Sequence, residues 1–173
     1  MNADVRTPKI AVQFATSRRN VPSATSLRYW SIAVLESFSR GRKPPIYALT
    51  IRIIGTAESR ALNRRWLGKD KPTNVLSFPS SSLKSPSLQP PANLLGDLAI
   101  CAPVVIREAR EQGKLAEAHW AHMVVHGVLH LLGFDHADSR DAKKMETLEV
   151  EILREFGYQD PYVCHEGVAT SPL

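Results

Sequence analysis

The chain has 173 residues, of which 43% are hydrophobic, and it carries a formal net charge of +5. This length predicts a single domain over residues 1–173, and the basic balance favours acidic partners such as nucleic acid. Apolar runs fall short of the roughly 18 residues that span a bilayer, and the first twenty residues lack the apolar segment of a secretory signal. Two cysteines, Cys101 and Cys164, are too few for a disulfide framework. We therefore expect reduced thiols, a cytoplasmic location and no membrane partner.

The N-terminal part of the chain is predicted to alternate strands and helices. Residues 10–14 alternate bulky apolar side chains with small or polar ones, which predicts a first strand. Residues 23–39 carry apolar side chains at spacings of three and four, which predicts a helix. A second strand is expected over residues 46–54, and apolar side chains on both of its faces indicate an inner position in the sheet.

A short helix is expected next, from Thr56 as its N-cap to an end at Gly68. Leu62 and Trp66 are predicted to lie on its inner side. Its outer side is expected to carry three arginines: Arg60, Arg64 and Arg65.

Two further strands are expected, over residues 75–78 and 94–101, and their closeness along the chain predicts a hairpin. The intervening residues 79–93 are rich in serine and proline, which predicts a mobile loop at the tip of that hairpin.

The C-terminal half of the chain is predicted to be helical. Pro103 is typical of the first turn of a helix, and Gly113 of its end. A second helix is expected over residues 116–132, and Asp138 is the expected N-cap of a final helix that reaches Phe156. The predicted fold class is α/β (α+β), with a single layer of about four mixed strands packed with about five helices. The N-terminus is expected to be loose and the C-terminal tail irregular.

Three histidines within one short segment are the main candidates for a functional site. His126 and His130 lie four residues apart, so on a helix their side chains project from one face. Gly133 can take the left-handed conformation that ends a helix, which allows His136 to fold back towards this pair. Three neutral imidazoles with one open position are typical of a catalytic zinc ion. We therefore predict one Zn²⁺ on this helix and the following turn, with another divalent transition metal as the alternative.

The same spacing occurs in zinc peptidases of the H-E-x-x-H-x-x-G-x-x-H type. Their second position holds the glutamate that acts as general base, but here that position is Gly127, so a peptidase is the disfavoured alternative. Glycine inside a helix costs about 1 kcal/mol relative to alanine, so Gly127 needs a reason. Either its missing side chain leaves room for substrate, or it permits a tight contact between helix and sheet.

Four segments of the chain resemble the YbeY family of bacterial endoribonucleases, the ribosomal RNA maturation factors. They are TAES (56–59) together with Leu62 and Asn63, KDKPTNVLSFP (69–79), LGDLAI (95–100) and HWAHMVVHGVLHLLGFDH (119–136). The resemblance implies a zinc-dependent, single-strand-specific endoribonuclease that processes the end of small-subunit ribosomal RNA and takes part in ribosome quality control. It implies single-stranded RNA, ribosomal RNA and the ribosome as partners. It also implies that the metal ligands are His126, His130 and His136.

One position departs from the family pattern. Family members usually carry an arginine where this chain has Leu67, and Arg64 or Arg65, nearly one helical turn earlier, could replace it. Four cations either contact RNA phosphate or form a solvated helix end: Arg64, Arg65, Lys69 and Lys71. A ribosome-associated assembly factor with a structural metal is the alternative function.

Other polar residues near the three histidines are secondary candidates. We expect water at the open metal position to be the catalytic group. Asp135 either assists this water, by orienting a ligand or moving protons, or only forms the turn. His119 and His122 continue the histidine face, and we expect them to be polar groups at the mouth of the cleft rather than proton carriers.

Overall fold

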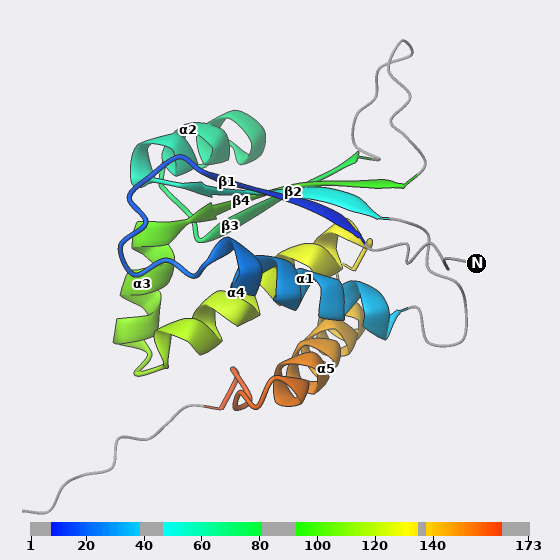
Figure 1. Ribbon diagram of the computed structural model, residues 1–173. Coiled ribbons are helices and arrows are strands. Elements are labelled where there is room, and N and C mark those ends of the chain that lie inside the picture. Colours follow the sequence, from blue (N-terminus) through cyan, green and yellow to red (C-terminus); the bar gives the residue numbers. More distant parts are fainter. Residues whose placement is uncertain (1–7, 39–46, 81–92, 135–137, 164–173) are drawn as a thin grey trace, which may run out of the picture.

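The computed structural model describes residues 8–38, 47–80, 93–134 and 138–163 (Figure 1). Within these residues, four strands form one sheet: β1 (Lys9–Phe14), β2 (Ala48–Ile54), β3 (Val75–Pro79) and β4 (Leu94–Cys101). The strand order is β1-β2-β4-β3, with β1 and β4 parallel to β2 and with β3 antiparallel to β4. The sheet is therefore mixed, β2 is an inner strand as predicted, and β3 lies at an edge.

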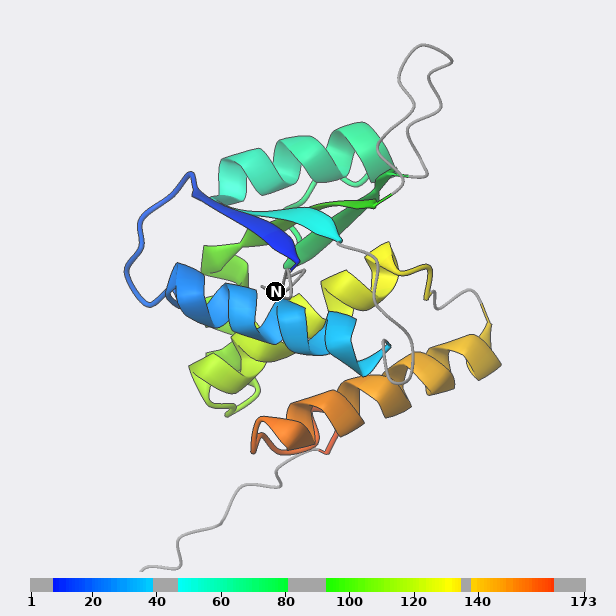
Figure 2. The same ribbon diagram turned by 45° about the vertical axis from the view of Figure 1, so that its right-hand side comes forward.

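The described residues also form five helices: α1 (Ala24–Ser37), α2 (Thr56–Leu67), α3 (Ala102–Glu111), α4 (Ala116–Leu131) and α5 (Ser139–Glu155). Helix α2 covers one face of the sheet, whereas α1 and α4 lie on the other (Figures 1 and 2). Helix α5 packs against α4 and α1 on the side away from the sheet. The α/β class and the predicted order of elements are confirmed.

Helix α4 lies at the centre of the larger hydrophobic core. It contacts three other helices and the strands β3 and β4. Most of its circumference is apolar and buried, as expected for a helix that is covered on several sides. Its fully or almost fully buried apolar side chains include Trp120, Val124, Val125, Val128 and Leu129. A polar side chain on this helix therefore lies in apolar surroundings and needs a hydrogen-bond partner.

Gly127 is explained by a tight contact between α4 and the sheet. A Cβ atom at this position would lie 2.9 Å from Cδ2 and 3.0 Å from Cδ1 of Leu98 on β4. The same face of α4 contacts β3, where the Ser77 hydroxyl donates a hydrogen bond of 3.3 Å to the Gly127 carbonyl. Of the two explanations offered by the sequence, the structure supports helix–sheet packing.

Helix α2 differs from the prediction at both ends. Its N-cap is Gly55, which makes no side-chain capping bond, and Thr56 is the first helical residue. Trp66 was expected on the inner side of α2, and its ring does lie 5.7 Å from that of Phe78 on β3, but the residue remains 58% exposed. Gly68 ends the helix as predicted, in the left-handed conformation with φ 69°.

The remaining boundaries agree closely with the sequence. Asp138 caps α5 as predicted, and its Oδ1 accepts hydrogen bonds of 2.8 Å from the backbone N–H groups of Arg140 and Asp141. Cys101 is a buried free thiol. Most of the predicted loop 79–93, the turn with Asp135 and His136, and Cys164 lie outside the described residues. In the described part of the chain, none of the helices combines the length and the apolar character needed to cross a membrane.

Candidate metal centre

Four histidines form a row along one face of α4: His119, His122, His126 and His130. The successive ring centroids are separated by 6.3, 6.2 and 4.6 Å. This regular spacing follows from the helical period, because residues three or four apart lie one above the other. Apart from Glu117 in the first turn, the rest of the helix is apolar, so the buried rings of this row require polar partners.

Glu149 on α5 is the partner of the two central histidines. Its side chain is fully buried, with Oε1 2.7 Å from Nδ1 of His126 and Oε2 3.1 Å from Nε2 of His122. The Tyr162 hydroxyl donates a further hydrogen bond to Oε2. Burial by itself would raise the pKa of Glu149, but these hydrogen bonds lower it to about 2. The carboxylate is therefore ionised at neutral pH and accepts from all three groups.

This carboxylate fixes the tautomer of His126. An ionised carboxylate only accepts hydrogen bonds, so Nδ1 of His126 must carry a proton, and in the neutral ring Nε2 then carries the lone pair. That Nε2 atom lies 3.1 Å from Nε2 of His130. Two nitrogens bound to one tetrahedral zinc ion are roughly 3.3 Å apart, so the two rings already have the spacing of a shared ligand pair. The donor atoms present therefore fit a transition-metal ion.

A second possible set of metal ligands includes the carboxylate of Glu149 itself. Ligand atoms of His122, His126 and Glu149 lie within 4.8 Å of one another, and these three residues could hold a metal ion. The predicted third ligand, His136, lies outside the described residues, so the structure brings together two of the three predicted ligands, His126 and His130.

His126 and His130 line a cleft of about 620 Å³ that also includes the edge strand β3 and the C-terminal part of α2. The cleft therefore extends around the edge of the sheet. Leu67, at the position where the sequence resemblance leads us to expect an arginine, lines this cleft and is 58% exposed. The four cations predicted to contact RNA are all exposed at the end of α2 and in the segment that follows it: Arg64, Arg65, Lys69 and Lys71.

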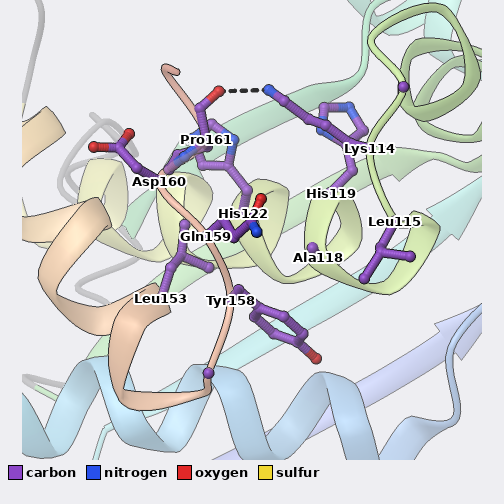
Figure 3. A pocket seen from close by; sticks show the side chains of 12 residues that line it. Lys114, Leu115, Ala118, His119, His122, Leu153, Tyr158, Gln159, Asp160 and Pro161 are labelled. Atoms are coloured by element: carbon purple, nitrogen blue, oxygen red, sulfur yellow. Dashed lines mark hydrogen bonds between the residues drawn. The ribbon is translucent and has the colours of Figure 1, made fainter. Parts of the chain in front are cut away.

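His119 and His122 do not lie at the mouth of this cleft, contrary to the prediction. They are only 3% and 8% exposed, and they line a separate cavity of about 300 Å³. Figure 3 shows this cavity between α4 and the segment after α5, where the Lys114 amine donates to the carbonyl of Pro161. His119 is held by Glu108 on α3, with 3.0 Å between Nε2 and Oε2. The burial of both rings follows from the central position of α4.

Two carboxylates that hold the histidine row, Glu149 and Glu108, were not among the predicted site residues. Glu149 lies four residues after Met145 and three before Ile152, within the stripe of α5 that was correctly predicted to point inward. A lone carboxylate in an apolar stripe is the signal that could have revealed it, since buried acids are paired. Glu108 also binds Asn74, whose Nδ2 lies 3.2 Å from Oε2 of Glu108.

Comparisons with known proteins identify the family of this chain. A family model described as endoribonuclease YbeY matches residues 11–157. The solution structure of TM1509 from Thermotoga maritima is similar, with a TM-score of 0.52 and 22% identity over 89% of this chain and 99% of that chain. That likeness shows the fold alone. Because the family model matches most of the chain, this protein belongs to the YbeY endoribonuclease family.

Proposed function

We propose that this protein is a zinc-dependent endoribonuclease specific for single strands. We place its activity in the maturation of small-subunit ribosomal RNA and in ribosome quality control, in the cytoplasm. Family membership supports RNA cleavage. The observation that carries the metal dependence is the 3.1 Å approach of the Nε2 atoms of His126 and His130 at the wall of an open cleft.

The proposed ligands are His126, His130 and His136, and the proposed ion is one Zn²⁺. Gly133 has φ 95°, which ends the helix and turns the chain three residues before His136. Three imidazoles leave one coordination position open for substrate or water. Another divalent transition metal remains the alternative.

We assign Glu149 to orienting His126 rather than to binding the metal. Its oxygens already accept N–H groups from two imidazoles, and it is completely enclosed, whereas the His126 side chain is 23% exposed towards the cleft. A carboxylate behind a histidine ligand sets the ring orientation and increases its basicity. Burial also lowers the pKa of His122, which keeps that ring neutral beside the proposed cation.

The remaining groups would bind and position RNA. When bound, the metal ion supplies a water of lowered pKa and polarises a phosphoryl oxygen. Arg64, Arg65, Lys69 and Lys71 are proposed to bind backbone phosphates, so RNA affinity should fall as salt increases. Asp135 is proposed to move protons beside the third ligand.

One observation favours a peptidase as the second candidate. The edge strand β3 borders the cleft, and an extended peptide can add to the exposed edge of a sheet. However, Gly127 occupies the position of the catalytic glutamate and packs against Leu98, so this helix offers no general base there.

Cleavage assays on single-stranded RNA and on casein, each with and without a chelator, separate these functions. We expect RNA cleavage that a chelator abolishes and that zinc restores, with casein intact. Cleavage of casein alone would favour the peptidase.

The assembly-factor alternative is tested with His130→Ala. We expect this variant to lose RNA cleavage. Full cleavage together with a lowered melting temperature would instead indicate a structural metal.

A further inference from the structure

An exposed aromatic side chain lines the same cleft as the two histidines. Trp66, in the last turn of α2, is 58% exposed, although tryptophan is usually among the most buried residues. Leu62, one turn earlier on the same face, and Phe78 on β3 also line the cleft. The ring centroids of Trp66 and Phe78 are 5.7 Å apart at an interplanar angle of 65°. Phe78 therefore supports the indole ring on one side while much of the ring remains accessible.

The charges around Trp66 favour an anionic ligand. The Arg65 guanidinium lies 5.7 Å from the indole centroid, and Arg64 and Arg65 border an adjoining hollow. In that hollow, Arg60 is neutralised by Asp70, with N–O distances of 2.8 and 2.7 Å. Neither Arg64 nor Arg65 forms a salt bridge to an acidic residue in the described part of the chain. Arg65 therefore places a positive charge beside an accessible aromatic ring, and Arg64 adds another on the neighbouring surface of α2.

We propose that Trp66 is a stacking platform for one base of single-stranded RNA, with Arg64 and Arg65 binding the adjacent phosphates. This inference rests on the proposed nuclease function and adds a base-binding subsite to it. An exposed aromatic ring beside cations is the arrangement by which proteins bind single strands with little sequence preference. In a duplex both faces of a base are occupied by neighbouring pairs, so such a subsite also explains a requirement for single strands.

Fluorescence can test the stacking directly. The chain has three tryptophans, and the other two, Trp30 and Trp120, are only 2% and 1% exposed. Most of the emission accessible to solvent therefore comes from Trp66. We expect a short single-stranded RNA to quench this emission and to protect it from acrylamide, and Trp66→Phe to abolish both effects. RNA binding that leaves the emission unchanged would overturn the proposal.

Kinetics provide the second test. Trp66→Leu should raise the KM for single-stranded RNA roughly 5- to 100-fold with little change in kcat, and Trp66→Phe should retain most of the affinity. The control is Tyr29→Leu, because Tyr29 on α1 is 56% exposed but does not line the cleft. An unchanged KM in a folded Trp66→Leu variant would refute the platform.

The outcomes distinguish this proposal from the proposed function. If the wild type cleaves RNA and Trp66→Leu does so equally well, the nuclease function stands and the platform does not. If the wild type neither binds nor cleaves RNA, the nuclease function itself fails. Quenching by an extended peptide but not by RNA would assign the subsite to a peptide and overturn the proposal.

Discussion

At the scale of single residues, the buried carboxylates determine the state of the histidine row. A buried histidine without a hydrogen-bond partner would destabilise the folded protein. Glu149 accepts hydrogen bonds from His122 and His126, and Glu108 accepts one from His119. Glu149 thereby holds a proton on Nδ1 of His126, and Nε2 of that ring faces Nε2 of His130 at 3.1 Å. The proposed metal site therefore depends on a residue that faces it from another helix.

Replacing this carboxylate by an amide should weaken metal binding without removing the site. In Glu149→Gln we expect zinc affinity to fall about 10- to 100-fold, with one ion still bound per chain, because a carboxylate hydrogen-bonded to a ligand imidazole orients that ligand but does not itself bind the ion. Isothermal titration calorimetry with zinc measures both the affinity and the number of ions bound per chain. Glu151→Gln is the matched control, since Glu151 is exposed on the same helix. An unchanged affinity, or an altered metal donor set in X-ray absorption spectra, would contradict the orienting role.

Glu108 should give the protein a measurable pH dependence of stability. Burial raises its pKa, but hydrogen bonds from His119 and Asn74 outweigh this and bring it below the ordinary value of 4.5. A carboxyl group whose pKa is lower in the folded than in the unfolded protein stabilises the folded state at pH values above its unfolded-state pKa. This stabilisation is lost as the pH falls through the folded-state pKa. The stability difference between wild type and Glu108→Gln should be constant above about pH 6 and should shrink below about pH 4.5. Urea unfolding at several pH values tests this, and a constant difference throughout would contradict it.

At the scale of elements, the contact between α4 and the sheet decides where the histidines lie. Gly127 lets the helix approach Leu98 closely, and the proposed ligand pair, His126 and His130, lies on the same helix beside the edge strand β3. The helix period sets the spacing within the pair, whereas the sheet contact sets the position of the pair in the cleft.

Gly127→Ala should destabilise the protein despite the better helix propensity of alanine. The clash with Leu98 should cost about 1–3 kcal/mol, offset by about 1 kcal/mol from propensity. In a Leu98→Ala background the added methyl group has room, so the same substitution should be neutral or stabilising. Chemical denaturation of the wild type, of Gly127→Ala, of Leu98→Ala and of the double variant measures the coupling between the two substitutions as a difference in the free energy of unfolding. Equal destabilisation in both backgrounds would show that the contact is not the reason for the glycine.

At the scale of the whole molecule, periodicity predicted the elements and their order, because strands and helices bury regular faces. The same pattern predicted that the side chains of His126 and His130 lie together, since the two residues are local neighbours on one helix. It did not predict Glu149, which reaches the row from a helix that packs only in the folded chain. It also did not predict that Trp66, which contacts Phe78 on β3, remains 58% exposed, because a spacing pattern does not reveal how completely a neighbouring strand covers a side chain.

The central claim is that one cation is held by His126, His130 and His136, and metal content measures this most directly. Elemental analysis of protein purified without chelator or histidine tag should give close to one zinc per chain for the wild type and for His122→Ala. His126→Ala, His130→Ala and His136→Ala should each retain little. Full zinc in His130→Ala or His136→Ala, together with its loss in His122→Ala, would contradict the account and place the ion beside Glu149.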